Sequence, residues 1–84
     1  MIELFGVPRL RAGLDVVEVE ARSLGEALRA LGVSCPALTP SVVDGERLGA
    51  AYLVAINGLQ ITADPGTSLA EGDVVVLLAA DAGG

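Results

Sequence analysis

The fold of this chain is decided by residues 74–80, VVVLLAA, an uninterrupted apolar run. A strand that is apolar at every position is typical of the middle of a sheet. We therefore expect a central strand here, buried on both faces. The run leads directly into Asp81-Ala82-Gly83-Gly84, so these residues should leave the domain from a rigid element.

Two shorter strands are expected near the start of the chain. Ile2–Phe5 is a short stretch, apolar except for Glu3, that suits a buried strand, and Pro8 is expected to end it because proline donates no backbone hydrogen bond. Arg9–Gly13 is expected to be a turn or loop. Asp15–Ala21 then alternates with the period of a half-buried strand, and the two strands are predicted to form a hairpin.

A helix is predicted next by a capping box, in which a serine and a glutamate three residues later satisfy free N–H groups at a helix start. Ser23 and Glu26 have this spacing. Apolar residues follow at helical spacing, and Gly32 is the expected C-terminal stop. The apolar positions that should face the sheet are Leu24, Ala27, Leu28 and Leu31.

The middle of the chain is punctuated by prolines and glycines and has a weaker pattern. Asp44-Gly45 marks a turn, and a short helical turn is expected over residues 40–44. Tyr52–Ile56 is a predicted strand, and the Asn57-Gly58 pair after it is typical of two-residue hairpins. Leu59–Ala63 is then the predicted return strand.

Two turns separate this hairpin from the last strand. Asp64-Pro65-Gly66 is typical turn sequence. Leu69–Asp73 should form a second compact turn, which requires a positive φ at Gly72.

The predicted order is strand, strand, helix, strand, short strand, strand. A right-handed crossover through the helix would make the first and last strands parallel neighbours in mid-sheet. This is the β-grasp arrangement, an α+β fold in which one main helix packs across one face of a mixed sheet of four to five strands. We expect one β-grasp domain over residues 1–80 and a flexible tail over residues 81–84.

Composition argues against several classes of partner. The 84 residues carry a net charge of −6 with five arginines and no lysine, and only Phe5 and Tyr52 are aromatic. Such a chain is poorly suited to neutralising phosphates or stacking bases, so nucleic-acid binding is not expected. No run approaches about 18 apolar residues, so a membrane span is not expected either. The acidity favours protein partners with basic surfaces.

Catalytic and metal-binding groups are scarce in the sequence. There is no histidine, and Cys35 is the only cysteine. A lone cysteine forms no internal disulfide, which favours a reducing compartment such as the cytoplasm, and we expect Cys35 to be a small packed residue. The acidic residues fall at strand edges and turns, where they are usually solvated. We therefore expect no active site of the protein's own, no metal and no bound cofactor.

Several short motifs occur in order along nearly the whole chain. They are Phe5-Gly6-Val7-Pro8-Arg9 with Gly13, then Ser23–Leu31, Pro36-Ala37-Leu38, Ile56-Asn57-Gly58, Leu69–Val75 and Gly83-Gly84. Together they resemble the MoaD/ThiS family, the small ubiquitin-like sulfur carriers of bacteria. The motif of the first strand and the chain length most resemble the small subunit of molybdopterin synthase.

The resemblance implies a function in sulfur transfer. In such carriers an E1-like adenylyltransferase uses ATP and Mg²⁺ to adenylate the C-terminal glycine. A persulfide protein then provides sulfur, and the resulting thiocarboxylate donates it to an acceptor enzyme. For this chain the resemblance implies Gly84 as the sulfur-carrying residue, with Gly83 beside it. The implied acceptor is the large subunit of molybdopterin synthase, in molybdenum cofactor biosynthesis.

Partner contacts are also implied by the resemblance. Leu78 lies six residues before the end, where ubiquitin-like relatives often carry an apolar contact, and Phe5 would join it from the neighbouring strand. The alternative for both residues is a place in the core. Asp81 and Ala82 are expected to line the partner's channel together with the glycines.

Three other functions stay open at this point. The chain is also consistent with a sulfur carrier for thiamine, cysteine, tRNA thiolation or a specialised metabolite. A ubiquitin-like modifier that joins lysines on other proteins is the second alternative. The third is a β-grasp interaction module without chemistry at its tail.

Overall fold

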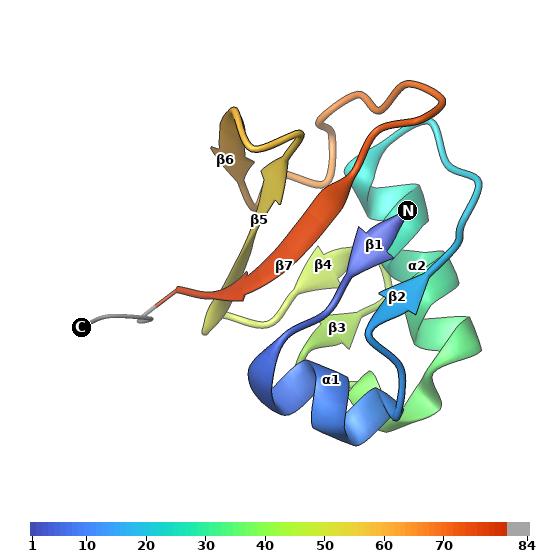
Figure 1. Ribbon diagram of the computed structural model, residues 1–84, viewed down its shortest axis with the longest axis vertical. Coiled ribbons are helices and arrows are strands. Elements are labelled where there is room, and N and C mark those ends of the chain that lie inside the picture. The colour runs from blue at the N-terminus through green and yellow to red at the C-terminus, as the bar shows by residue number, and fades with distance from the viewer. Residues whose placement is uncertain (81–84) are drawn as a thin grey trace.

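The computed structural model describes residues 1–80, which form a mixed five-stranded sheet with a helix, α2 (Leu24–Ser34), packed against it (Figure 1). β7 (Val75–Ala79) lies in the middle of the sheet, parallel to β1 (Ile2–Glu3) and antiparallel to β5 (Tyr52–Ile56). This is the predicted β-grasp arrangement. The strands in spatial order are β2 (Val16–Val17), β1 (Ile2–Glu3), β7 (Val75–Ala79), β5 (Tyr52–Ile56) and β6 (Gln60–Thr62).

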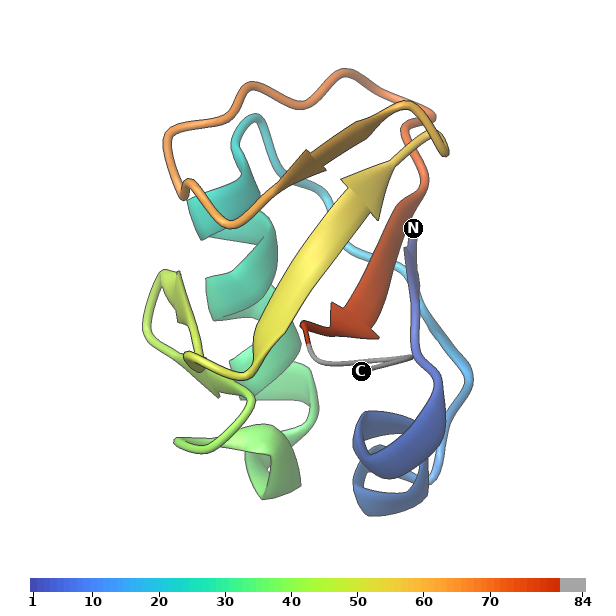
Figure 2. The ribbon, with the colours of Figure 1, turned by 90° about the vertical axis from the view of Figure 1, so that its left-hand side faces the viewer.

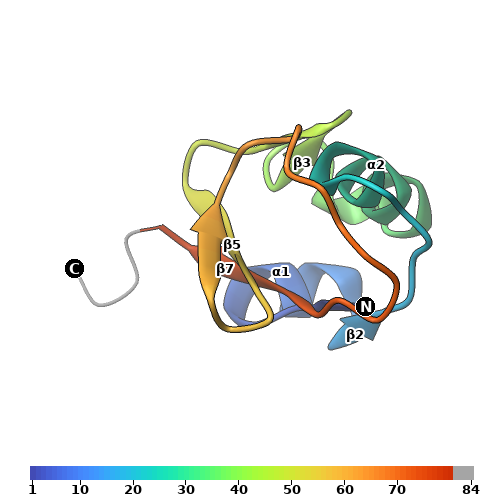
Figure 3. The same cartoon turned by 90° about the horizontal axis from the view of Figure 1, so that it is seen from above.

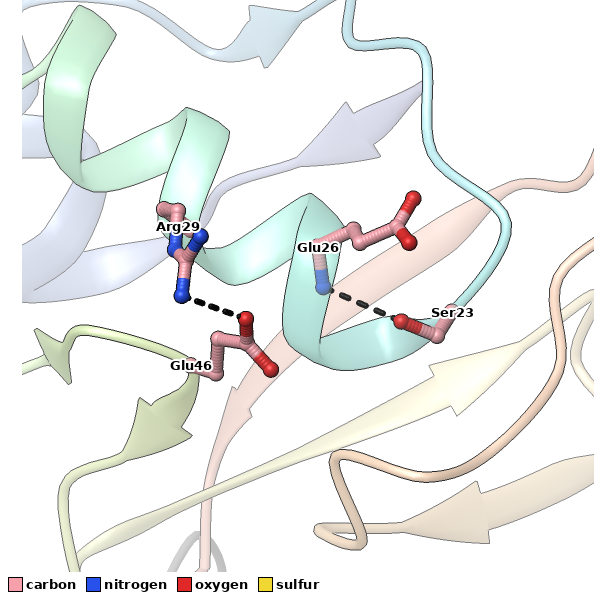
Figure 4. Close-up of polar contacts among 4 residues, drawn as sticks. All are labelled: Ser23, Glu26, Arg29 and Glu46. Carbon is pink, nitrogen blue, oxygen red and sulfur yellow. Dashed lines mark hydrogen bonds and ion pairs between the residues drawn. The ribbon is translucent and has the colours of Figure 1, made fainter.

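α2 begins with the predicted capping box (Figure 4). The backbone N–H of Glu26 donates to Ser23 Oγ at 3.2 Å. Glu26 Oε1 in turn accepts the backbone N–H of Arg22 at 3.0 Å, one residue before the cap. The four predicted apolar positions of this helix are all buried, which confirms its orientation toward the sheet.

The predicted stop at Gly32 is wrong, because α2 continues to Ser34 and ends just before Pro36. Gly32 has a packing role instead. A Cβ on this residue would come within 3.1 Å of Thr39 Oγ1, so glycine lets the helix approach the following segment closely.

The segment after α2 forms a short 3₁₀ helix, η1 (Pro36–Leu38), and a small hairpin of β3 (Val43–Asp44) and β4 (Arg47–Leu48). The helical turn expected at residues 40–44 lies slightly earlier, where the Val42 N–H donates to the Leu38 carbonyl, and Val43–Asp44 is a strand. The turn after Asp44 is confirmed. Figure 4 also shows the ion pair of 2.6 Å between Arg29 and Glu46, which joins this hairpin to α2. Because both side chains are exposed, we expect it to contribute at most about 1 kcal/mol.

The loop expected at Arg9–Gly13 is a helix, α1 (Gly6–Ala12). Pro8 is tolerated because it lies in the first turn, where backbone N–H groups have no partner within the helix. Gly13 ends the helix with a left-handed φ of +73°, and its N–H donates to the Arg9 carbonyl. The sequence predicts that Pro8 ends a strand, but β1 already ends at Glu3 and Pro8 lies in the first turn of a helix that begins at Gly6.

β7 is central as predicted, but it is buried on one face only. Val75 and Leu77 point into the core and are 2% and 1% exposed. Val76 and Leu78 point the other way and are half-buried. The reason is visible in Figure 3, where α2 lies on one side of β5 and β7. One helical layer covers one face of a sheet and leaves the opposite face accessible.

Candidate functional site

The two aromatic residues of the chain, Phe5 and Tyr52, line the same apolar groove at the end of β7. The groove has a volume of about 400 Å³. Figure 2 shows the end of β7 close to the segment that leads from β1 into α1. We call this groove the exit surface; its other lining residues are Gly6, Val7, Pro8, Ala51, Leu77, Leu78 and Ala79.

The register of the sheet brings Phe5 and Leu78 together. β1 and β7 pair Ile2 with Val75 and Glu3 with Val76, so the same offset places Phe5 level with Leu78. Phe5 has an extended backbone and is 50% exposed, so the alternative of a core position for it is wrong. The two residues expected to contact a partner therefore lie on one surface.

The chain is held in place as far as the last described residue. Tyr52 pairs with Ala79 in the β5–β7 ladder, and the Ala80 N–H donates to the Ala51 carbonyl at 2.6 Å. The other predicted site residues, Asp81, Ala82, Gly83 and Gly84, lie outside the described residues, and so does the predicted tail at 81–84.

The exit surface continues onto the open face of the sheet. Strand pairing sets Val16, Glu3, Val76, Ala55 and Ile61 in one row across all five strands. The outer members Val16 and Ile61 are 40% and 67% exposed. The row is apolar except for Glu3, and Val76 and Ala55 are half-buried. Exposed apolar side chains on one sheet face are typical of a surface that binds another protein.

The opposite end of β7 is held by a polar network that joins two of the sequence motifs. Asn57 Nδ2 donates to Asp73 Oδ1 at 2.9 Å, and the Val74 N–H donates to Asn57 Oδ1 at 2.9 Å. Asp73 Oδ2 accepts the Ala70 N–H at 2.8 Å. The predicted positive φ at Gly72 is confirmed at +88°. The sequence predicts both turns but not that they bind each other.

Asp73 is the acid whose proton affinity this network changes. The hydrogen bond from the Ala70 N–H, followed by that from Asn57, lowers the pKa of its carboxyl below the ordinary value of 3.8. Both bonds stabilise the charged form, so Asp73 stays ionised, and its bonds to the turn persist, to a lower pH than for an ordinary aspartate.

Groups able to perform chemistry are sparse in the described part of the chain. Cys35 is 5% exposed and packed in the core, as predicted. Within residues 1–80, His, Cys, Asp and Glu side chains form no group of three or more able to hold a metal ion. Over the same residues, no helix has the length and apolar character needed to cross a membrane.

The model of the ThiS family matches residues 2–84. The chain belongs to the ThiS family. It is therefore a ubiquitin-like protein of the sulfur carrier and modifier type. A search of curated proteins finds no match.

Solved structures place this ThiS-family protein among known β-grasp proteins. SAMP1 from Haloferax volcanii is 32% identical, with a TM-score of 0.75 over 99% of this chain and 96% of that chain. Small archaeal modifier protein 1 of H. volcanii, in another structure, is also 32% identical, with a TM-score of 0.70 over 90% of each chain. A chain of the BexX/CysO complex from Amycolatopsis orientalis is 20% identical, with a TM-score of 0.80 over 99% and 97% of the two chains, and shows the shared fold.

Tyr52 is the exit-surface residue that the sequence interpretation of this ThiS-family protein missed. It was interpreted only as the start of a strand. Its side chain is half-buried and packs against the core as well as lining the groove. The rarity of aromatic residues in this chain was an indication that the sequence already offered. Aromatic residues are enriched where proteins bind one another.

Proposed function

We propose that this ThiS-family protein is a sulfur carrier whose Gly84 carboxylate is adenylated by an E1-like enzyme and converted to a thiocarboxylate. The observation that carries the proposal is the exit surface. Both aromatic residues and Leu78 lie at the end of β7, a few residues before a Gly-Gly pair that the family match includes.

The exit surface supports docking of the activating enzyme. Phe5 and Val7 are 50% and 51% exposed, so a partner that covers them removes apolar surface from water. Ala80 is fixed to Ala51, which gives the residues after it a defined starting point. Gly83 and Gly84 have no Cβ, so this part of the chain fits a channel too narrow for side chains.

The proposed chemistry takes place on the partners. A carboxylate oxygen of Gly84 attacks the α-phosphorus of ATP, and pyrophosphate leaves. The terminal sulfur of a persulfide donor attacks the acyl-adenylate and AMP leaves, after which a thiol cleaves the acyl disulfide to give the thiocarboxylate. ATP and Mg²⁺ belong to the activating enzyme, and the carrier provides no catalytic group of its own.

We propose the large subunit of a molybdopterin synthase as the acceptor. Support for this choice comes from the first-strand motif, Phe5-Gly6-Val7-Pro8-Arg9, which resembles the small subunit of that enzyme. The cytoplasm, where ATP and persulfide donors are available, is the proposed site of action.

A role as a protein modifier is the second candidate. The observation that favours it is the 32% identity to small archaeal modifier protein 1 over 90% of both chains. In this role Gly84 would form an isopeptide bond with a lysine of another protein. The chain has no lysine and therefore offers no side-chain amine for its own activated terminus.

Intact-mass spectrometry tests the proposal. The full chain is incubated with the E1-like enzyme of its organism, ATP, Mg²⁺ and sodium sulfide, which displaces AMP directly. We expect the mass gain of one sulfur replacing one oxygen, and no gain for a chain lacking Gly84. A gain in the truncated chain, or none in the full chain, contradicts the proposal. Gly-Gly remnants on lysines of other proteins in cell digests would favour the modifier role.

A further inference from the structure

A second groove lies at the opposite end of β7 from the exit surface. It has a volume of about 760 Å³ and is lined by residues 18–22, by 69–75, by Glu26 and Ala27 of α2, and by Met1 and Ile2. Figure 1 shows the start of β1, marked N, between the start of β7 and the chain that follows β2. The groove therefore lies in line with β1, between its two neighbouring segments. We call it the N-terminal groove.

The wall formed by residues 18–21 continues β2 as an extended edge. Burial alternates along residues 18–21. Val19 and Ala21 are half-buried against the core, whereas Glu18 and Glu20 are exposed. Within residues 1–80, the backbone of 18–21 makes no hydrogen bond outside the β2 ladder, whereas Arg22 accepts one from Leu69. A half-buried edge of free backbone groups is a template for another strand.

The register of β2 shows which of these backbone groups face the groove. The Leu4 N–H donates to the Asp15 carbonyl, and the ladder pairs Ile2 with Val17. Hydrogen-bonded pairs alternate along an antiparallel ladder, so the next positions whose N–H and C=O point toward β1 are Val19 and Ala21. An added strand in line with β1 would exchange its hydrogen bonds with these two residues.

The side chains around the groove differ on its two faces. Val19, Ala21 and Leu69 pack toward the core and form an apolar inner side together with Ala27. Residues of an added strand that pair with Val19 and Ala21 must point to this same side. The intervening residues of the added strand must point outward, beside Glu18 and Glu20.

The outer side of the groove is acidic. Five carboxylates line it against one arginine, Arg22, and the N-terminal ammonium of Met1, which already donates to the Asp73 carbonyl. Glu26 and Asp73 are hydrogen-bonded within the fold. Among the described residues, the carboxylates of Glu18, Glu20 and Glu71 have no hydrogen-bond or ion-pair partner. The negative charge of these three carboxylates is complementary to arginine or lysine side chains of a partner.

We propose that the N-terminal groove binds an extended segment of a partner protein as an added strand antiparallel to residues 18–21. In this segment, small apolar residues that face α2 alternate with arginine or lysine that faces outward. Backbone pairing fixes the segment in place, and the alternation selects its sequence. The proposal does not rest on sulfur transfer. Because the two grooves lie at opposite ends of β7, a partner held here leaves the exit surface accessible.

The direct probe is a fluorescein-labelled, amidated peptide of alternating arginine and valine, titrated with the full chain and followed by fluorescence anisotropy. We expect saturable binding at one site. The matched peptide carries N-methyl groups on its valines, which keeps its charge but removes the N–H groups that should pair with Val19 and Ala21. Two lost hydrogen bonds are expected to weaken binding roughly tenfold.

Variants of the chain test the contribution of charge. The double variant Glu18→Gln, Glu20→Gln should weaken peptide binding roughly tenfold. Its control, Asp15→Asn with Asp44→Asn, removes the same charge at exposed positions outside the groove lining and should change binding less than about twofold. Both pairs lie at exposed positions, so neither should prevent folding.

Amide hydrogen exchange measured by NMR distinguishes strand addition from simple charge attraction. Bound peptide should slow exchange at Val19 and Ala21 and leave Glu18 and Glu20 unchanged. The proposal is overturned by a lack of saturable binding, by equal binding of the N-methylated peptide, by equal weakening in the control pair, or by unchanged exchange at Val19 and Ala21.

Discussion

The two ends of β7 differ in chemistry although they belong to one five-residue strand. Its start is fixed by the Asn57–Asp73 network, and the N-terminal groove beside it is lined by carboxylates. Its end carries Phe5, Tyr52 and Leu78 on an apolar surface. At the first end Asn57 and Asp73 are paired with each other, and the remaining carboxylates face the groove. At the second end apolar side chains are only partly covered, with Phe5 50% exposed.

This difference separates what stabilises the fold from what serves a partner. Hydrogen bonds at the start of β7 close two turns and fix the strand. At its end Phe5 is 50% exposed, and Tyr52 and Leu78 are half-buried. These side chains therefore contribute less to folding than the fully buried residues of the inner face. Substitutions on the inner face of β7 and at its start should therefore lower stability. Substitutions on the exit surface should mainly slow the reaction with a partner.

The largest effect on stability is expected from Leu77→Ala on the inner face of β7. Leu77 is 1% exposed, so its truncation should lower the free energy of unfolding by about 2–5 kcal/mol. Leu78→Ala, on the outer face one residue later, should cost less than half as much. Urea denaturation of both variants measures this, and equal losses would show that the outer face is as important for folding as the inner one.

A smaller effect is expected at the start of β7. Asn57→Ala removes two side-chain hydrogen bonds and places a Cβ-bearing residue without a polar side chain at φ +53°, so we expect a loss of about 2 kcal/mol. Asn57→Gly removes the same two hydrogen bonds, but glycine adopts a positive φ without strain. We therefore expect Asn57→Gly to lower the free energy of unfolding by only about 1 kcal/mol. Thermal unfolding compares the two, and a loss in neither variant would exclude the network as a stabilising feature.

The smallest effect is the pH dependence that Asp73 contributes. Its folded-state pKa lies below 3.8 because the charged carboxylate accepts hydrogen bonds from Ala70 and Asn57. The stability it adds is therefore present above its ordinary pKa and is lost as the pH falls through the folded-state value. As the pH falls through this acidic range, the free energy of unfolding should decline less steeply for Asp73→Asn than for the wild type. An equal decline in both proteins would show that other groups cause the pH dependence.

Much of the fold was predictable because its determinants are local. The apolar run of β7, the Ser23–Glu26 capping box and the Asn57-Gly58 turn each specify a structure within a few residues. α1 was missed because Pro8 fits both the end of a strand and the first turn of a helix. The burial of β7 was overestimated, because a sequence does not show that only one face of the sheet is covered by a helix.

The site was predictable only in part. Leu78 and Phe5 were named from their places in the chain, whereas Tyr52 reaches the exit surface through the pairing of β5 with β7. The N-terminal groove was not predictable, because its walls come from residues about fifty positions apart in the chain. Pairing over such distances depends on the finished fold rather than on local pattern.

The central claim is that the apolar end of β7 presents Gly84 to an activating enzyme. The direct test compares the wild-type chain with Leu78→Glu and with the matched control Val33→Glu, whose position is 77% exposed on α2. Intact mass is followed over time with limiting E1-like enzyme, ATP, Mg²⁺ and sulfide. We predict that the wild type and Val33→Glu gain sulfur at similar rates, while Leu78→Glu is slowed by roughly 30-fold or more. Equal rates for all three, with Leu78→Glu folded, would contradict the account.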